Sequence, residues 1–153
     1  MSMTRVVSSV EIAAPVQDVF AYASDWQKWE EWWLGVSGFR PTTEVTRGNG
    51  TRYAYKGWLA GVAVEVETEI HDFVENVGWR GVGTRGMPHA TRWVFEPAGA
   101  GTRFTYVLEY RLPVPLLGPL LDALLMRPGW QRRLDGSLEN LKAHFEPPRH
   151  GVL

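Results

Sequence analysis

The stretch VAVEVETEIH, residues 62–71, decides how this chain folds. Two sets of residues alternate in it: Val62, Val64, Val66, Thr68 and Ile70 face one way, and Glu65, Glu67, Glu69 and His71 face the other. A period of two is typical of a β-strand with one buried and one solvated face. We therefore interpret the three glutamates as a solvated strand face rather than as paired catalytic carboxylates or a metal site.

The same alternation continues on both sides of this strand. Residues 51–56 precede it, and residues 79–83, 89–96 and 102–112 follow it. Short turns containing glycine, proline or asparagine separate these segments, which predicts consecutive antiparallel strands. After Gly35 we expect the chain to break into turns, punctuated by Gly38, Pro41 and Gly48.

Helical patterns lie towards the two ends of the chain. Residues 5–12 alternate as an opening strand, and Pro15 then suits the first turn of a short helix. A second short helix would carry Trp26, Trp29, Trp32 and Trp33. Leucines spaced by three and four predict a last helix from about Leu116 to Phe145, with a kink or break at Pro128 and Gly129. Helices outside the run of strands favour the α+β class, with a curved antiparallel sheet around the long C-terminal helix.

Length and composition restrict the class of protein further. The 153 residues fit one domain, which we place at residues 1–146, followed by a loose tail at 147–153. A formal net charge of −1 argues against nucleic acid as a partner, because such binding needs clustered Lys and Arg. Without cysteine, the chain has no disulfides or thiolate ligands. We find neither a secretion signal nor an apolar run long enough to span a membrane, and we expect a cytoplasmic protein.

Motifs for cofactors and metals are weak. Gly81, Gly83 and Gly86 have the spacing of a dinucleotide-binding loop, but a strand rather than a helix follows them. We interpret them as a glycine-rich strand end or bulge. The histidines lack the spacing of metal ligands, so we expect neither a metal nor an organic cofactor.

Four segments together resemble a known family. They are APVQDVF at residues 14–20, the tryptophan-rich segment at 26–33, GTRFTYVLEY at 101–110 and SLENLK at 137–142. Their order resembles the polyketide cyclase/dehydrase-like branch of the START-like (SRPBCC) superfamily, over about residues 6–145. The resemblance implies a helix-grip fold, in which a curved sheet wraps around the C-terminal helix and encloses a hydrophobic cavity. Members bind lipids, sterols, polyketides or plant hormones, and some are cyclases or aromatases.

The residues that face inward on the predicted strands are the candidate ligand-binding set. They are Tyr53, Tyr55, Thr68, Trp79, His89, Thr91, Trp93, Phe104, Tyr106 and Tyr110, to which we add Leu117 and Leu121 of the following segment. Aromatic rings with a few hydroxyls and one imidazole suit a mostly apolar ligand with a few polar groups. The alternative is that these residues fill the core and bond one another.

Three functions remain open. The first is binding of a hydrophobic or aromatic small molecule, lipid-like or polyketide-like, with Trp79 and Trp93 nearest to it. The second is a cyclase or dehydratase without metal or cofactor, in which His89 is the acid or base and a tyrosine, such as Tyr106, polarises a ketone. The third is a protein-interaction module that uses the tryptophan-rich segment, with a homodimer as one form of it.

The four clustered tryptophans have two interpretations. They could form a lid over a ligand, or they could anchor the small helices on the sheet, which we favour for Trp26 and Trp29. Trp32 and Trp33 are adjacent, so we expect that they do not both point into the same core.

Overall fold

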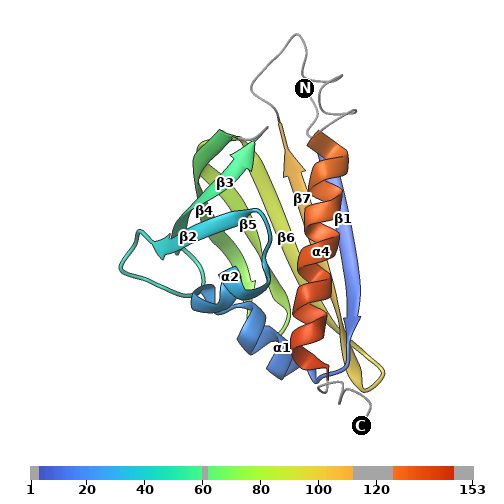
Figure 1. Ribbon diagram of the computed structural model, residues 1–153. Coiled ribbons are helices and arrows are strands. Elements are labelled where there is room, and N and C mark those ends of the chain that lie inside the picture. Colours follow the sequence, from blue (N-terminus) through green and yellow to red (C-terminus); the bar gives the residue numbers. More distant parts are fainter. Residues whose placement is uncertain (1–3, 60–61, 112–125, 147–153) are drawn as a thin grey trace.

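The computed structural model describes residues 4–59, 62–111 and 126–146, and its strands form one antiparallel sheet (Figure 1). The strands are β1 (Thr4–Ile12), β2 (Val36–Pro41), β3 (Arg52–Leu59), β4 (Val62–Val74), β5 (Gly78–Arg85), β6 (His89–Ala98) and β7 (Gly101–Tyr110). Their order across the sheet is β1-β7-β6-β5-β4-β3-β2, so that consecutive strands pair and β1 closes against β7. The predicted antiparallel meander is confirmed.

The helices are α1 (Val16–Ala23), the short 3-10 turn η1 (Trp26–Lys28), α2 (Trp29–Trp32) and α4 (Arg127–Phe145). The apolar face of α1 buries Val19, Phe20 and Ala23, as predicted. Phe20 packs edge-to-face on Trp79 and Phe95 of the sheet, with ring centroids 5.7 and 5.0 Å apart. The small helices therefore anchor one end of the sheet's inner face.

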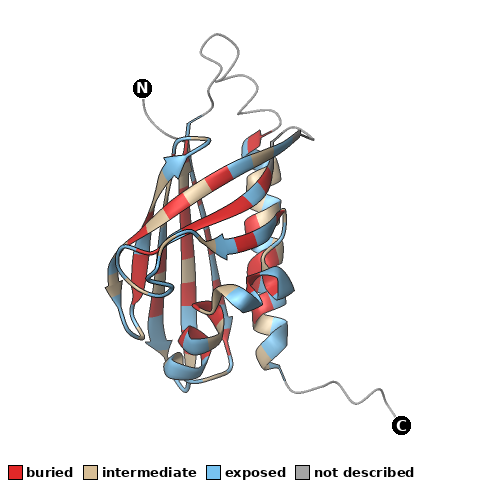
Figure 2. Ribbon diagram, turned by 90° about the vertical axis from the view of Figure 1, so that its left-hand side faces the viewer, coloured by how far each residue is buried: buried red, intermediate tan, exposed pale blue. Residues whose placement is uncertain are grey.

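Helix α4 lies along β1 on the inner face of the curved sheet (Figure 1). Leu134, Leu138 and Leu141 of this helix are buried in the core. Ser8, on the buried face of β1, donates a hydrogen bond of 2.6 Å to Asp135 of the helix. Buried and exposed bands alternate along the strands (Figure 2), as the period of two predicts. The α+β helix-grip architecture is confirmed.

Strand β2 corrects the expectation that only turns follow Gly35. It pairs with β3, and its register shifts between Ser37 and Arg40. At this bulge Gly38 has a φ of +69°, and Val36 and Phe39, three positions apart, are both buried. The extra residue breaks the period of two, which is why the alternation did not reveal the strand.

The last helix is described only from Arg127 onward. The predicted start at Leu116, the predicted turn at residues 60–61 and the tail at 147–153 lie outside the described residues. Pro128 stands in the first turn of α4, where its missing N–H removes no intrahelical bond. From there to Phe145 the helix is uninterrupted, so Pro128 does not divide the described helix.

Candidate functional site

The concave side of the sheet is filled mainly by aromatic rings. Trp93 of β6 is at their centre, with the rings of Trp79, Trp33 and Trp32 at centroid distances of 4.6, 5.3 and 5.5 Å. Trp93 is only 2% exposed. Rings at these distances interdigitate as in a close-packed core, which leaves little free space between them.

The adjacent residues Trp32 and Trp33 both reach Trp93, so the prediction that they point into different surroundings is wrong. Helix α2 ends at Trp32, and Trp33 already has an extended backbone, with φ −85° and ψ 116°. The rotation between successive helical residues therefore does not separate the two side chains. Their rings are instead nearly parallel, with centroids 5.9 Å apart.

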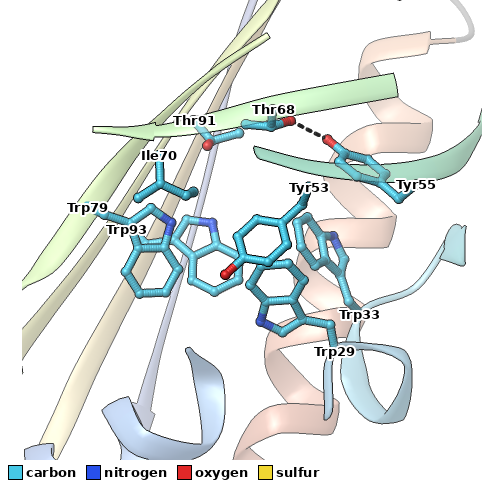
Figure 3. Close-up of a pocket in the computed structure, with 9 residues that line it drawn as sticks. All are labelled: Trp29, Trp33, Tyr53, Tyr55, Thr68, Ile70, Trp79, Thr91 and Trp93. Atoms are coloured by element: carbon cyan, nitrogen blue, oxygen red, sulfur yellow. Dashed lines mark hydrogen bonds between the residues drawn. The ribbon is translucent and has the colours of Figure 1, made fainter. Parts of the chain in front are cut away.

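A first cavity, here the tryptophan cavity, has a volume of about 20 Å³ (Figure 3). Its lining consists of Trp29, Trp33, Tyr53, Tyr55, Thr68, Ile70, Trp79, Thr91 and Trp93. The inner-face prediction included six of these side chains. The candidate ligand-binding set did not include Ile70, although the alternation placed it on the same face, nor Trp29 and Trp33, for which a lid and a helical anchor were the two interpretations.

A second cavity, here the histidine cavity, has a volume of about 50 Å³. Its lining consists of Val36, Tyr55, Gly57, Val64, Val66, Met87, His89, Leu108 and Trp130. Of this set, the candidate ligand-binding residues included only Tyr55 and His89, whereas Val64, Val66 and Leu108 were predicted on the inner face without a role in binding. Val36 was missed because β2 was missed, and Trp130 because the face of α4 was read from its leucines alone. Tyr55 belongs to both linings, so the two cavities are neighbours.

A buried chain of hydrogen bonds begins at Tyr55. Its hydroxyl is 2.9 Å from Thr68 Oγ1, which is 2.7 Å from His89 Nε2. The other ring nitrogen of His89, Nδ1, is 2.7 Å from the Met87 carbonyl oxygen. Because a carbonyl only accepts, Nδ1 must carry a proton and donate it to Met87. Both nitrogens of His89 therefore have protein partners.

Two glycines of β5 make room for this arrangement. Thr68 of β4 is aligned with Gly83 of β5, and His89 of β6 reaches Thr68 across that glycine. A Cβ atom at Gly83 would lie 2.6 Å from His89 Nδ1, and one at Gly81 would lie 2.4 Å from Thr91 Oγ1. The register of β4 against β5 also shifts here, so the predicted bulge is present. The glycine run thus provides space for side chains of the neighbouring strand.

Burial keeps the titratable groups of the site neutral. Loss of hydration lowers the pKa of His89, and it raises the pKa of Tyr53 and of Tyr55 to about 12. Among the described lining residues of the two cavities, none carries a charge at neutral pH. An interior of this kind suits an uncharged ligand, because a buried charge without a partner is costly.

The remaining predicted residues lie in packed core or outside the described chain. Phe104, Tyr106 and Tyr110 are at most 2% exposed and line neither cavity. For these three, the structure favours the alternative that they fill the core. Leu117 and Leu121 are outside the described residues.

The outer face of the sheet is polar, as the alternation predicted. Glu65 and Glu69 pair with Arg40 and Arg52, and Glu67 accepts a hydrogen bond of 2.8 Å from the Thr84 hydroxyl. The three glutamates thus form the predicted solvated face. In the described part of the chain, no group of three or more His, Asp or Glu is placed to hold a metal, and no helix is long and apolar enough to cross a membrane.

A larger hollow of about 280 Å³ lies elsewhere, around the start of β5. Its lining includes the exposed residues Asp72, Arg80 and Arg92, and the first two form an ion pair of 3.0 Å. Charged and exposed walls favour water over an apolar ligand, so we place the candidate site in the interior.

Comparison with known proteins identifies the family. The family model described as polyketide cyclase/dehydrase and lipid transport matches residues 3–146. No curated protein matches the chain. Among solved structures, the chain is similar to TTHA0849 from Thermus thermophilus, with 26% identity and a TM-score of 0.81, covering 93% of this chain and 97% of that one.

Two further structures share the fold. A START superfamily protein from Mycobacterium smegmatis is 19% identical, with a TM-score of 0.70 and coverage of 90% of this chain and 98% of that one. The di-domain ARO/CYC StfQ of the steffimycin biosynthetic pathway is also 19% identical, with a TM-score of 0.74, and this chain covers 53% of it with 99% of its own length. The chain belongs to the polyketide cyclase/dehydrase and lipid transport family.

Proposed function

We propose that this member of the polyketide cyclase/dehydrase and lipid transport family binds an uncharged, largely aromatic small molecule, polyketide-like or lipid-like, in the histidine cavity. The observation that carries the proposal is the lining of that cavity. It combines aliphatic and aromatic side chains with two neutral polar groups, Tyr55 and His89, and the cavity lies within the core. Apolar walls with a few fixed polar groups are typical of small-molecule sites.

The cavity must expand to admit such a ligand. Its volume of about 50 Å³ is well below the roughly 300–1,000 Å³ of ordinary ligand pockets. Met87 and Trp130 are the half-buried members of the lining that stand at the ends of segments, just before β6 and in the first turns of α4. Methionine is unbranched and changes rotamer easily. We infer that these two side chains move outward when the ligand enters.

A filling substitution tests the proposal. Gly57 of β3 lines the histidine cavity, and a Cβ atom there would meet nothing within 4 Å. Gly57→Val therefore occupies the cavity without a backbone clash. Calorimetric titration with naphthol should show saturable binding to the wild type and an affinity reduced by about tenfold or more in Gly57→Val, a loss of about 1.4 kcal/mol.

Lys56→Val is the matched control, because it adds the same side chain on the exposed face of the same strand. It should bind naphthol as the wild type does. Equal binding by Gly57→Val, or binding that appears only in partly unfolded protein, would exclude the histidine cavity as the site.

Catalysis is a second candidate, favoured by the hydrogen-bond chain. When a substrate carbon gives a proton to the Tyr55 oxygen, Tyr55 can pass its own proton to Thr68, and Thr68 can pass its proton to His89 Nε2. The net result is proton transfer from substrate to imidazole, which a cyclase or dehydratase requires. If a poly-β-ketone is turned over, His89→Ala should slow the reaction at least about tenfold while the protein stays folded. An unchanged rate would remove His89 from the mechanism.

The interaction-module hypothesis loses most of its support. Trp29 and Trp32 are 4% and 1% exposed, so they are not available to a partner protein. Trp26 and Trp33 are half-buried. The homodimer and the cytoplasmic location stay predictions.

A further inference from the structure

We propose that Tyr55 presents a hydrogen-bond acceptor, and not a donor, to the ligand, so that the site selects molecules that carry a hydroxyl group over otherwise identical ethers. The inference rests on the proposed function and deepens it, because it names the polar group that the ligand must bring. It follows from the direction of the hydrogen-bond chain that joins Tyr55, Thr68 and His89.

The Met87 carbonyl oxygen sets this direction. It only accepts, so His89 donates to it from Nδ1, and in the neutral imidazole Nε2 is then left as an acceptor. The 2.7 Å contact between Nε2 and Thr68 is a hydrogen bond only if the threonine hydroxyl donates. A hydroxyl has one proton, so Thr68 has none left for Tyr55.

Tyr55 must therefore donate its own proton to Thr68 across the 2.9 Å contact. Its oxygen keeps a free acceptor position, and among the described residues no other donor lies within hydrogen-bond distance of it. Tyr53, the other tyrosine of the cavity linings, also has its proton engaged, since it donates to the Thr46 carbonyl at 2.8 Å. In the histidine cavity, the Tyr55 oxygen therefore offers its lone pair to a ligand.

The surroundings of His89 keep the imidazole neutral and the direction fixed. The groups next to it are Thr68 of β4 and Gly83 of β5, and Tyr110 of β7 is aligned opposite. Tyr55 of β3 and Trp130 of α4 share its cavity lining. None of these is an acid that would stabilise an imidazolium ion. Among the described residues, no charged group stands at either end of the hydrogen-bond chain, so the direction of donation is not reversed.

A ligand hydroxyl placed beside Tyr55 can donate to its oxygen. An ether oxygen in the same position would set lone pairs against lone pairs in a buried site, which leaves both groups unsatisfied. Among the described residues, the buried indole N–H of Trp130 has no hydrogen-bond partner, and Trp130 belongs to the same lining. A hydroxyl and an ether can both accept a hydrogen bond from this N–H. A difference in affinity between the two ligands therefore reports the hydrogen bond that the ligand hydroxyl donates to Tyr55.

Naphthol and its methyl ether form the matched probe pair, with affinities measured by calorimetry at neutral pH. We expect the wild type to bind naphthol roughly tenfold more tightly than the ether. Thr68→Val removes the acceptor of the Tyr55 proton, so Tyr55 can donate to the ligand. The affinity for the ether should then rise relative to the affinity for naphthol. Tyr55→Phe should bind both probes with similar affinity.

Thr105→Val is the control, because it removes the same hydroxyl at a half-buried position of β7 that lines neither cavity. It should keep the wild-type preference. If Thr68→Val does not fold, Tyr55→Phe alone decides whether the preference for naphthol over its ether depends on the Tyr55 hydroxyl. Tight binding of both probes by the wild type without discrimination would overturn the acceptor role of Tyr55, whereas failure of both probes to bind would contradict the proposed function itself.

Discussion

His89 shows how much a single buried side chain controls at this site. Burial removes water from the imidazole and lowers its pKa below the ordinary value of 6.5. A group with a lowered pKa in the folded state binds its proton more readily when unfolded, so the protein loses stability as the pH falls. As the pH falls just below 6.5, the unfolded chain therefore binds a proton at this histidine before the folded protein does.

We predict that the free energy of unfolding of the wild type decreases as the pH falls from about 7 to about 5, and that His89→Gln removes part of this decrease. Urea unfolding at a series of pH values measures it, and the difference between the two proteins isolates His89 from the other histidines. Identical pH dependence in both would show that His89 is not the buried neutral group described.

Gly83 matters because of the space that it leaves. A methyl group there would lie 2.6 Å from His89 Nδ1 and displace the ring from Met87, so Gly83→Ala should cost about 1–3 kcal/mol of unfolding free energy. Gly57→Ala is the control, because its new methyl group meets nothing within 4 Å. Thermal and urea unfolding of both variants check the contrast. Equal stabilities would mean that the ring has room to shift.

Alternation in the sequence predicted that Tyr55, Thr68 and His89 share the inner face, but not that they bond to one another. The partner of Thr68 in the register of β3 and β4 is Tyr53, and Tyr55 reaches it diagonally. His89 reaches it across a whole strand, at a glycine. Such contacts depend on the registers of three strands, which no local pattern contains.

At the scale of elements, regular periods were predictable and their interruptions were not. Strand β4 follows its alternation from Ala63 to His71, so the faces of this part could be assigned from the sequence. Beyond it, Asp72 has a φ of +53° and the register against β5 shifts before Val74. Strand β2 contains a bulge, and α2 ends one residue before Trp33, so one tryptophan leaves the helical spacing. Gly35, with a φ of +78°, is the signal for that helix end which the sequence did contain.

The docking of α4 on β1 gives the element-scale prediction. Ser8 is buried and donates to Asp135, whereas its neighbour Ser9 faces outward and contacts Thr105 at 3.1 Å. Ser8→Ala should lower the free energy of unfolding by about 1–2 kcal/mol, and Ser9→Ala by less than about 0.5 kcal/mol. Urea unfolding of the two variants tests this. A larger loss in Ser9→Ala would contradict the helix position.

At the scale of the whole molecule, the sheet and α4 enclose an interior that is nearly full. The sequence predicted an aromatic interior correctly, but it gave no information on how much space remains, because packing depends on where every ring points. In the described part of the chain, the tryptophan and histidine cavities are both small, and Tyr55 lines each of them. Ligand binding therefore depends on how readily the lining moves.

Met87→Ala tests that dependence. Removing this half-buried side chain enlarges the histidine cavity, so naphthol should associate faster and bind several-fold more tightly. Met126→Ala removes the same side chain at a buried position outside the cavity lining and should bind as the wild type does. Stopped-flow fluorescence measures both rates. Slower association in Met87→Ala would contradict an opening at this side chain.

The central claim is that the interior beside Tyr55 holds the ligand. The most direct measurement is the set of nuclear Overhauser effects between bound naphthol and the isotope-labelled protein. We predict contacts from the naphthol ring protons to Tyr55, Val66 and Leu108, which line the histidine cavity. Contacts confined to Val74 and Val77, in the exposed hollow beside β5, would place the ligand outside the core and contradict the claim.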